Sequence, residues 1–278
     1  MIVIMTNKNN PFEPIFENPP MRMKACRHGN MLYNTHDVYI GRSFDLYGEY
    51  AESEMSFLAH FVKPGQNVYD VGANIGAHTI FFAQTVGPQG RVLSFEPQRP
   101  VFQTLCANIV LNALDNVMTF HAGAGEGSGT ATVPLLDYNR EGNFGGISLT
   151  GQQGGETVQV MALDQIRLPS LALIKIDVEG MELAVLKGAA QTIAKYMPVL
   201  YVENDRKEKS PQLLNHIQAM GYRAYWHLAP LYNADNFAGH QDNVFANTVS
   251  INLLCLPASA DQNIKGLKEV QSVDEFPI

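Results

Sequence analysis

The sequence predicts an α/β fold with a mainly parallel sheet. Between residues 67 and 256, short apolar segments alternate with longer segments whose apolar residues recur every three or four positions. That alternation is typical of parallel strands joined by helices. Glycine and proline residues separate the two kinds of segment. The last two apolar segments have no helical segment between them, so we expect an antiparallel hairpin at one edge of the sheet.

The order of the elements follows from this alternation. The proline-rich residues 1–20 are predicted to form an extended arm and residues 22–47 short strands. A helix is expected after Gly48, ending at Pro64-Gly65. Further strands are predicted at 68–71, 91–95, 117–121, 171–176, 198–202, 222–227 and 248–256, and helices at 75–85, 100–111, 212–220 and directly after Gly180. Two long connections, 123–155 and 230–247, are expected to be loops.

The composition excludes several classes of protein. The chain has 278 residues, of which 46% are apolar and 17% charged, as in ordinary globular proteins. Its net charge is −8 and no basic run offsets it, so no nucleic-acid partner is expected. No apolar run approaches the ~18 residues of a membrane helix. Three widely spaced cysteines without a CxxC pair indicate reduced thiols, and we expect a cytoplasmic protein.

The strongest local feature is the loop Asp70–Gly76 (DVGANIG), which joins a strand to a helix. Its glycines allow a sharp turn and a close approach of a ligand to the backbone. Glu96 ends the next strand, where a carboxylate can accept hydrogen bonds from ribose hydroxyls. Asn74 stands where the dinucleotide fingerprint G-x-G-x-x-G has its second glycine, and its bulk disfavours a pyrophosphate. S-adenosylmethionine has a ribose and a cationic end but no phosphate, which suits this loop better.

Several segments together resemble the FkbM-type class I methyltransferases. These segments are the loop with Thr79, the tripeptide Phe95-Glu96-Pro97, Leu163-Asp164 ahead of IKIDVEGME (174–182), and Asn143–Gly146 with Ser148-Leu149. The resemblance covers about residues 45–255. It implies a Rossmann-like class I methyltransferase fold, a twisted sheet with helices on both faces, and S-adenosylmethionine as cofactor. It also implies O-methylation of a hydroxyl on a sugar, glycan or secondary metabolite.

The resemblance also implies the roles of individual residues and segments. Residues 1–48 become an arm with short strands, 49–256 the catalytic domain and 257–278 a C-terminal tail. The residues expected to bind the methyl donor are Asp70, Gly72, Ala73, Asn74, Gly76, Thr79, Glu96, Pro97 and Asp177. The acceptor is expected to be a small molecule or glycan that carries a hydroxyl.

Methyl transfer to an alcohol needs in-line positioning and a base or a metal near the acceptor oxygen. The catalytic candidates lie at the ends of the fourth, fifth and sixth core strands and are Asp177, Glu179, Glu203 and His227. Asp177, Glu203 and Asn204 carry oxygen atoms of the kind that bind Mg²⁺. His227 has a side chain suited to a general base. We favour the metal-free version, because Glu203 stands where a catechol-type enzyme has an aspartate and no third carboxylate is assured.

Other candidates and functions stay open at this point. His78 is expected to lie near the cofactor, and Tyr47, Tyr50 and Glu54 either cover the donor site or pack in the core. An NAD-dependent dehydrogenase or epimerase would share the ribose-binding carboxylate. A non-catalytic protein that binds S-adenosylmethionine would share the whole donor site.

Overall fold

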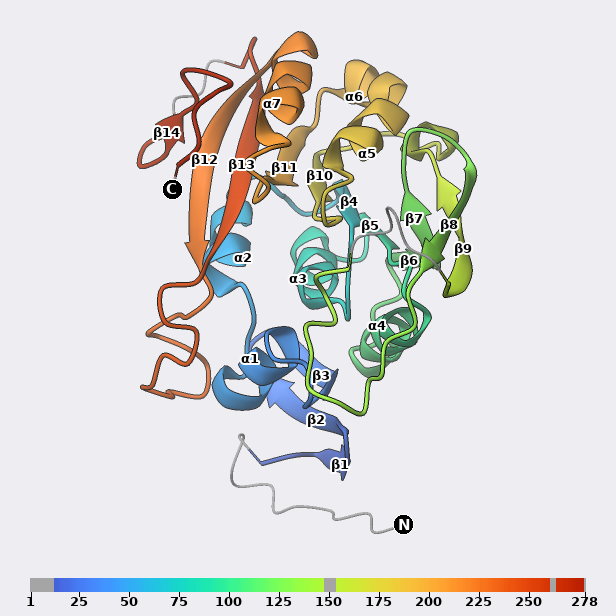
Figure 1. The fold of residues 1–278 in the computed structure, drawn as a ribbon, viewed down its shortest axis with the longest axis vertical. Helices are drawn as coiled ribbons and strands as arrows, with labels where there is room; N and C mark the ends of the chain where they lie inside the picture. The colour runs from blue at the N-terminus through green and yellow to red at the C-terminus, as the bar shows by residue number, and fades with distance from the viewer. Residues whose placement is uncertain (1–12, 148–153, 261–263, 278) are drawn as a thin grey trace.

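The computed structural model describes residues 13–147, 154–260 and 264–277. Its centre is an eight-stranded sheet with the strand order β14-β12-β13-β11-β10-β4-β5-β6 (Figure 1). The parallel strands are β4 (Asn67–Val71), β5 (Arg91–Phe95), β6 (Val117–Phe120), β10 (Leu173–Ile176) and β11 (Val199–Glu203). Numbered along the chain, their spatial order is third, second, first, fourth, fifth. This is the order of a Rossmann-like sheet, and it places the topological switch point between β4 and β10.

The C-terminal hairpin was predicted and is present. β12 (Tyr222–Pro230) pairs with β13 (Val249–Pro257) in antiparallel register, and the short β14 (Lys268–Glu269) lies at the outer edge. β13 also pairs with β11 and therefore lies between β11 and β12. The carboxyl end of β12 is thus one strand further from the switch point than its place in the chain suggests.

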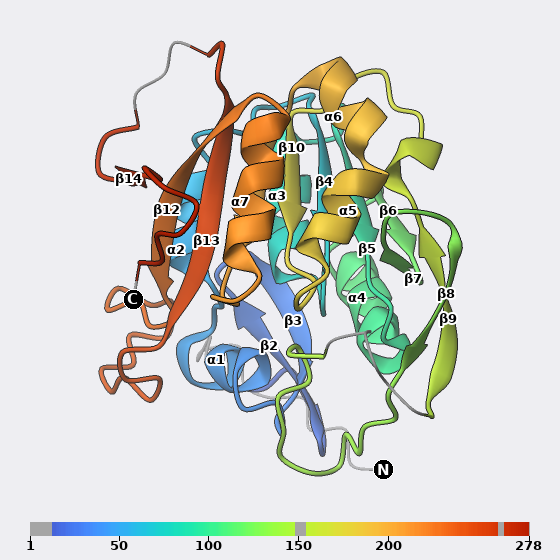
Figure 2. The same cartoon turned by 45° about the horizontal axis from the view of Figure 1, so that its top comes forward.

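Helices cover both faces of the sheet, which confirms the predicted α/β class. α5 (Glu182–Gly188), α6 (Ala190–Tyr196) and α7 (Ser210–Ala219) lie on the front face in Figure 2, with α2 (Glu52–Leu58) and α3 (Ala77–Val86) behind it. Alternate residues of β4 point to opposite faces of the sheet. Tyr69 and Val71 pack with α5–α7, whereas Val68 packs with α2 and α3. None of the described helices is long and apolar enough to cross a bilayer.

The N-terminal region forms a small antiparallel sheet followed by a helix. Its strands are β1 (Phe16–Asn18), β2 (Met21–Cys26) and β3 (Gly29–Asn34), and the helix is α1 (Ile40–Tyr47). Asn108 on α4 (Arg99–Leu111) holds the sheet in place, because its side chain bonds both backbone groups of Leu32 at 2.7 and 3.0 Å. The strands within 22–34 were predicted. The prediction of strands for 40–47 is wrong, because Ile40, Phe44 and Tyr47 bury one face of a helix.

The glycine-rich connection is not the long loop that we predicted. β7 (Ala122–Ala124), β8 (Gly129–Val133) and β9 (Glu156–Met161) form a separate three-stranded sheet in the order β7-β9-β8. β7 consists of Ala-Gly-Ala, so no apolar alternation in the sequence reveals it. Ser148 and Leu149 lie outside the described residues.

The helix expected after Gly180 is split in two at Ala189. The side chain of Asp164, which belongs to a short 3₁₀ turn (Leu163–Gln165), accepts hydrogen bonds from the amides of Gln191 and Thr192 at 3.0 and 2.7 Å. It therefore caps α6 from a distant part of the chain.

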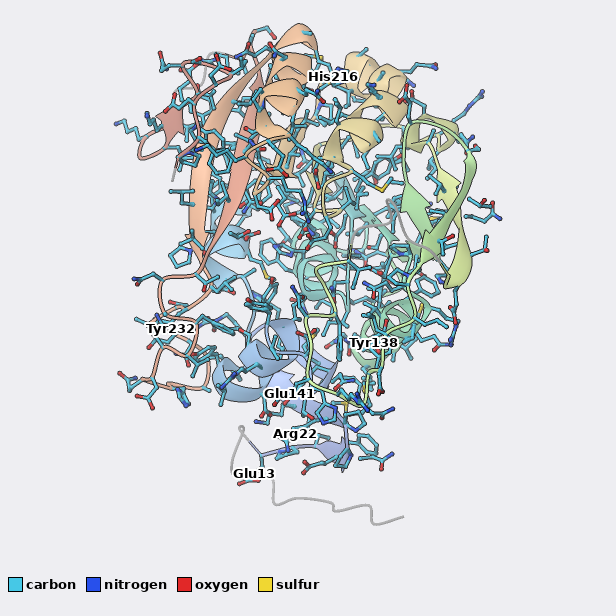
Figure 3. The ribbon with its side chains drawn as sticks, viewed as in Figure 1. Glu13, Arg22, Tyr138, Glu141, His216 and Tyr232 are labelled. Carbon is cyan, nitrogen blue, oxygen red and sulfur yellow. The ribbon has the colours of Figure 1, made fainter. Side chains whose placement is uncertain are left out.

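Two connections lie on either side of α1, below the carboxyl edge of the parallel strands (Figures 1 and 2). One is residues 134–147, after β8, and the other is residues 231–248, between β12 and β13. Tyr138 and Tyr232, labelled in Figure 3, belong to one connection each. The Tyr138 hydroxyl donates to Oε1 of Gln98 at 3.0 Å, and the Tyr232 ring packs edge-on against Tyr47 with 5.3 Å between centroids. Both connections are thus attached to the body of the protein beside the switch point.

Candidate active site

The backbone amides of the loop after β4 donate hydrogen bonds within the protein. Gly72 and Ala73 donate to the carbonyl of Phe95 at 3.0 and 2.9 Å, and Asn74 donates to Oε2 of Glu96 at 3.0 Å. The amide of Ile75 donates to Asn74 Oδ1 at 2.8 Å, and the amide of Gly76 donates to the Ala73 carbonyl at 2.9 Å. Every amide from residue 72 to 76 is therefore engaged within the protein, and the loop offers no cradle of free N–H groups for a phosphate.

Gly72 is required by a close approach of two backbones. Its φ is +80°, and a Cβ built on it would lie 1.7 Å from the carbonyl oxygen of Asp177. The loop after β4 and the end of β10 thus touch at this point, and no side chain fits between them.

Asp70 and Thr79 lie behind the loop, although both were predicted to bind the donor. Both are fully buried, and Thr79 Oγ1 donates to Asp70 Oδ2 at 2.6 Å. The Lys175 ammonium lies 3.5 Å from Asp70 Oδ1 and donates to the Gly72 carbonyl at 3.0 Å. These contacts fasten α3, β4 and β10 together, so Asp70 and Thr79 support the loop and do not line the cavity in front of it.

Glu96 ends β5 as predicted and is 3% exposed. Its carboxylate accepts hydrogen bonds from the amides of Asn74 and Gln98 at 3.0 and 2.8 Å. Burial raises the pKa of Glu96 to about 7, even though these two amides favour its ionised form.

Two cavities meet at Glu96. The larger has a volume of about 270 Å³ and extends from the loop after β4 to the start of β13. The smaller, of about 40 Å³, is lined by Pro97, Ala122–Ala124 and Met181. Gly72, Glu96, Gly145, Asp177 and Glu179 line both. An elongated molecule can therefore occupy both cavities at once.

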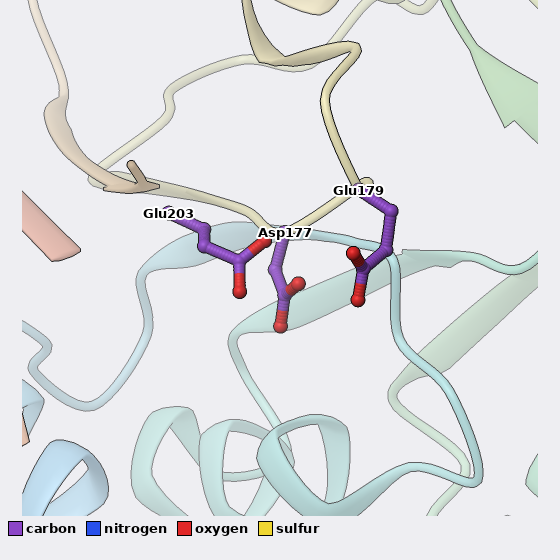
Figure 4. A group of neighbouring side chains, drawn as sticks. All are labelled: Asp177, Glu179 and Glu203. Carbon is purple, nitrogen blue, oxygen red and sulfur yellow. The ribbon is translucent and has the colours of Figure 1, made fainter. Parts of the chain in front are cut away.

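Three carboxylates predicted as catalytic come together in the larger cavity. In Figure 4 the side chains of Asp177, Glu179 and Glu203 point to the same side of the ends of β10 and β11, and one oxygen of each lies within 4.8 Å of the others. Glu179 has a φ of +56°, a strained value for a residue with a side chain. Arg206 holds it with a hydrogen bond of 2.6 Å.

The charges of this group depend on each other. Lys175 Nζ lies 3.2 Å from Asp177 Oδ2. Burial disfavours both charges, but their attraction raises the pKa of Lys175 and lowers the pKa of Asp177. Burial and the Asp177 charge raise the pKa of Glu203 well above its ordinary value. The two shifts have opposite directions, so the pair favours an ionised Asp177 and a protonated Glu203. Burial and Asp177 also raise the pKa of Glu179 to about 7.

The larger cavity is acidic as a whole. One lysine, Lys175, faces it together with His78. Six carboxyl side chains line it: Glu54, Glu96, Asp177, Glu179, Glu203 and Asp205. A cationic ligand is favoured in such a cavity and an anionic one is repelled.

His227, which was predicted as a general base, does not line this cavity. It lies on β12, and β13 separates it from the end of β11. Its Nδ1 lies 2.7 Å from the hydroxyl of Tyr201 and its ring packs against Phe57 at 4.3 Å. Burial lowers the pKa of His227. These contacts leave His227 a packed, hydrogen-bonded residue.

Lys175 is a site residue that the sequence pattern did not single out. Tyr50 and Glu54 were left undecided, and His78 was expected near the cofactor; all three line the larger cavity. A lysine within the apolar strand 171–176 was the available signal, since a buried charge needs a partner. Glu54 lies on α2, before the loop, and only the folded chain brings it to the cavity.

Comparison with known proteins now identifies the family. The model of the methyltransferase FkbM domain matches residues 70–224, more than half of the chain. The chain belongs to this family. The matched region begins at Asp70 and includes the loop, Glu96 and the carboxylates at the ends of β10 and β11. The resemblance seen in the sequence is thereby confirmed.

Individual similar proteins share less than a third of their aligned residues with this chain. Methyltransferase sdnD of Sordaria araneosa is 29% identical over 156 residues, which are 44% of this chain and 59% of that protein. The hexuronic acid methyltransferase AglP of Haloferax volcanii is 27% identical over 158 residues, or 55% of this chain and 62% of that protein. The chain thus spans about three-fifths of the length of these relatives. The crystal structure of methyltransferase FkbM from Methylobacillus flagellatus KT has a TM-score of 0.47 and 18% identity, covering 78% of this chain and 55% of that one.

Proposed function

We propose that this FkbM-family protein uses S-adenosylmethionine to methylate a hydroxyl group of a sugar, glycan or secondary metabolite. The observation that supports this most strongly is the combination of an acidic cavity with a loop whose amides are all engaged. Together they favour a nucleoside ligand that is cationic and lacks phosphates.

The donor fits the two cavities in one orientation. Its adenine enters the smaller cavity, where Ala122–Ala124 and Pro97 supply backbone and apolar contacts. Its ribose hydroxyls donate to Glu96, and its methionine part lies over the loop after β4. The sulfonium then faces the carboxylates around Asp177. Transfer of the methyl group converts the sulfonium to a neutral thioether, which weakens this attraction and favours release of the product.

The remaining part of the larger cavity is left for the acceptor. It lies toward β11 and β13 and is lined by polar groups, among them Glu203, Asp205 and Ser250. Carboxylates and hydroxyls accept hydrogen bonds from the hydroxyl groups of an acceptor. The name of the relative AglP, a hexuronic acid methyltransferase, agrees with a sugar acceptor.

The two alternatives from the sequence are less well supported. A dehydrogenase or epimerase that binds NAD needs free N–H groups for a pyrophosphate, and the amides of residues 72–76 are engaged. A non-catalytic protein that binds S-adenosylmethionine would have no use for the polar space beyond Asp177.

Isothermal titration with S-adenosylmethionine, S-adenosylhomocysteine and NAD tests the proposal. We expect both adenosyl compounds to bind and NAD not to bind. Glu96→Ala should weaken S-adenosylmethionine binding by about 1.5–3 kcal/mol, because bonds to a charged group are lost. Glu208→Ala, a change of an exposed carboxylate, serves as the control and should bind normally. NAD binding more tightly than S-adenosylmethionine would refute the proposal.

A further inference from the structure

A histidine and a glutamate form a buried pair in the wall of the larger cavity. His78 lies in the first turn of α3 and Glu54 on α2. His78 Nε2 is 3.3 Å from Glu54 Oε2, and each side chain is 7% exposed. Both residues line the cavity. They come from separate elements and meet only at this point.

Glu54 is itself held in place from β13. Asn252 Nδ2 donates to Glu54 Oε1 at 3.3 Å and to Ser250 Oγ at 2.9 Å. Asn252 fixes one oxygen of Glu54, and the other oxygen lies 3.3 Å from His78 Nε2. These two atoms make no hydrogen bond in this geometry, but the charge of the carboxylate favours a proton on Nε2. The described residues supply no hydrogen-bond partner to the second ring nitrogen, Nδ1. This arrangement leaves the Nδ1 lone pair free for a ligand.

The pair lies on the side of the cavity away from the expected nucleoside. Glu96, at the end of β5, marks the ribose end. Glu54, the partner of His78, lies on α2. Asn252, which bonds Glu54, lies on β13, and β13 follows β10 and β11 in the order of the sheet. The His78 charge also lowers the pKa of Asp177, after burial and the direct partners Lys175 and Glu203, so the two side chains act within one space.

We propose that His78 is the general base of the reaction and that Glu54 is its positioning residue. This inference rests on the proposed function. Nδ1 of His78 takes the proton of the acceptor hydroxyl while the hydroxyl oxygen forms its bond to the methyl carbon. The carbon–sulfur bond breaks and its electron pair stays on sulfur. The imidazolium is stabilised by the Glu54 carboxylate and returns the proton to water after the product leaves.

Other ionisable groups line the same cavity as His78. The titratable side chains that line the cavity besides Glu54 are Tyr39, Tyr50, Glu96, Lys175, Asp177, Glu179, Glu203 and Asp205. Single variants of His78 and Glu54 are therefore needed to assign any pH dependence to this pair.

The first experiment needs no acceptor. Long-range ¹H–¹⁵N NMR of the protein with S-adenosylhomocysteine reports which ring nitrogen of His78 carries the proton, with His78→Gln used to assign the signals. We expect the Nε2–H form above the histidine pKa, and a lower His78 pKa in Glu54→Gln. A ring protonated on Nδ1 in its neutral form, or a His78 pKa that Glu54→Gln leaves unchanged, would overturn the inference.

The second experiment measures methyl transfer to an equimolar pool of the methyl glycosides of glucose, galactose, mannose and rhamnose. His78→Gln should lower kcat by ~10²–10⁴-fold and change KM for S-adenosylmethionine by less than about threefold. The wild-type kcat should rise with pH to a plateau at the His78 pKa from NMR, and Glu54→Gln should move that plateau to lower pH. His60→Gln, an exposed histidine, is the matched control and should behave as wild type.

The outcomes separate this inference from the proposed function. If His78→Gln weakens S-adenosylmethionine binding by tenfold or more, His78 holds the donor and the base assignment is wrong. A His78→Gln enzyme with nearly wild-type kcat would also overturn it, while titration of the wild type with S-adenosylmethionine still supports the donor site. If S-adenosylmethionine does not bind at all, the proposed function fails, whatever the NMR result.

Discussion

Two opposing influences act on the carboxyl group of Glu96. It is buried, which disfavours its charge, yet it accepts two backbone hydrogen bonds that favour it. The result is a pKa of about 7, so the charge of this group changes near neutral pH. Ribose hydroxyls and a cationic donor favour the ionised form. Binding of the donor and ionisation of Glu96 are therefore linked.

This linkage predicts a pH dependence of donor affinity. The folded protein favours protonated Glu96, so the stability contributed by this group is present below its unfolded pKa of ~4.3 and is lost as pH rises through about 7. Donor binding depends on pH in the opposite direction, because the donor favours the ionised form of Glu96. The dissociation constant for S-adenosylmethionine, measured by titration calorimetry, should fall about tenfold from pH 6 to pH 8. Glu96→Gln should abolish this change.

Glu179 provides the matched control, because its pKa is also about 7 but it lies at the carboxylate cluster and not at the ribose end. Glu179→Gln should keep most of the pH dependence. Loss of the dependence in Glu179→Gln and its retention in Glu96→Gln would contradict the placement of the ribose.

Lys175 bears on the metal question that the sequence left open. The carboxylates Asp177, Glu179 and Glu203 are close enough to bind a cation together. However, the ammonium of Lys175 already lies 3.2 Å from Asp177, and burial and the Asp177 charge raise the pKa of Glu203, which favours its neutral form. We expect that Mg²⁺ at ~1 mM shows no saturable binding by calorimetry and that a chelator leaves methyl transfer unchanged. Saturable Mg²⁺ binding that Asp177→Asn abolishes would contradict this account.

At the scale of secondary structure, the site depends on how closely the loop after β4 approaches the end of β10. Gly72→Ala should lower the free energy of unfolding by about 3 kcal/mol or more, because the new Cβ would lie 1.7 Å from the Asp177 carbonyl oxygen. Gly65 is the control, since its φ of +82° is close to the +80° of Gly72 and nothing lies within 4 Å of the place a Cβ would take there. Gly65→Ala should cost only about 1 kcal/mol of backbone strain. Equal losses in urea unfolding would show that the close approach is not the cause.

The elements that the sequence predicted well are those with a strong local pattern. Parallel strands such as Asn67–Val71 are apolar and bounded by turns, and the helices between them bury one stripe. The elements that it missed depend on distant partners. β7 is Ala-Gly-Ala and exists because β9 pairs with it from more than thirty residues later. The break between α5 and α6 depends on Asp164, and this too is a tertiary contact.

The same distinction applies to the candidate site. Glu96 and the residues of the loop could be predicted because strand ends and glycines fix their positions locally. The position of His227 could not, because the insertion of β13 between β11 and β12 is a matter of topology. The pairing of Glu54 with His78 depends on how α2 packs on α3 and β13, which no local pattern contains. The assignment of residues 1–48, 49–256 and 257–278 to an arm, a catalytic domain and a tail stays a prediction.

At the scale of the whole molecule, the site is enclosed by parts of the chain that are far apart in sequence. The carboxyl edge of the sheet supplies the charged groups, and α1 and the two connections around it supply the surrounding walls. Tyr47 on α1 joins these parts, because its hydroxyl donates to the Asp242 carbonyl at 2.9 Å and accepts from the Val244 amide at 2.9 Å. On the other side, Gln98 donates to the Phe144 carbonyl at 2.8 Å. The N-terminal region is thus part of the site.

A crystal structure of the protein with S-adenosylhomocysteine tests the central claim most directly. We expect both ribose hydroxyls within hydrogen-bond distance of Glu96, the adenine against Ala122–Ala124, and the sulfur facing Asp177 and the space in front of His78. The amides of residues 72–76 should keep their protein partners. A nucleoside bound elsewhere, or a loop that releases these amides to hold the ligand, would contradict the account.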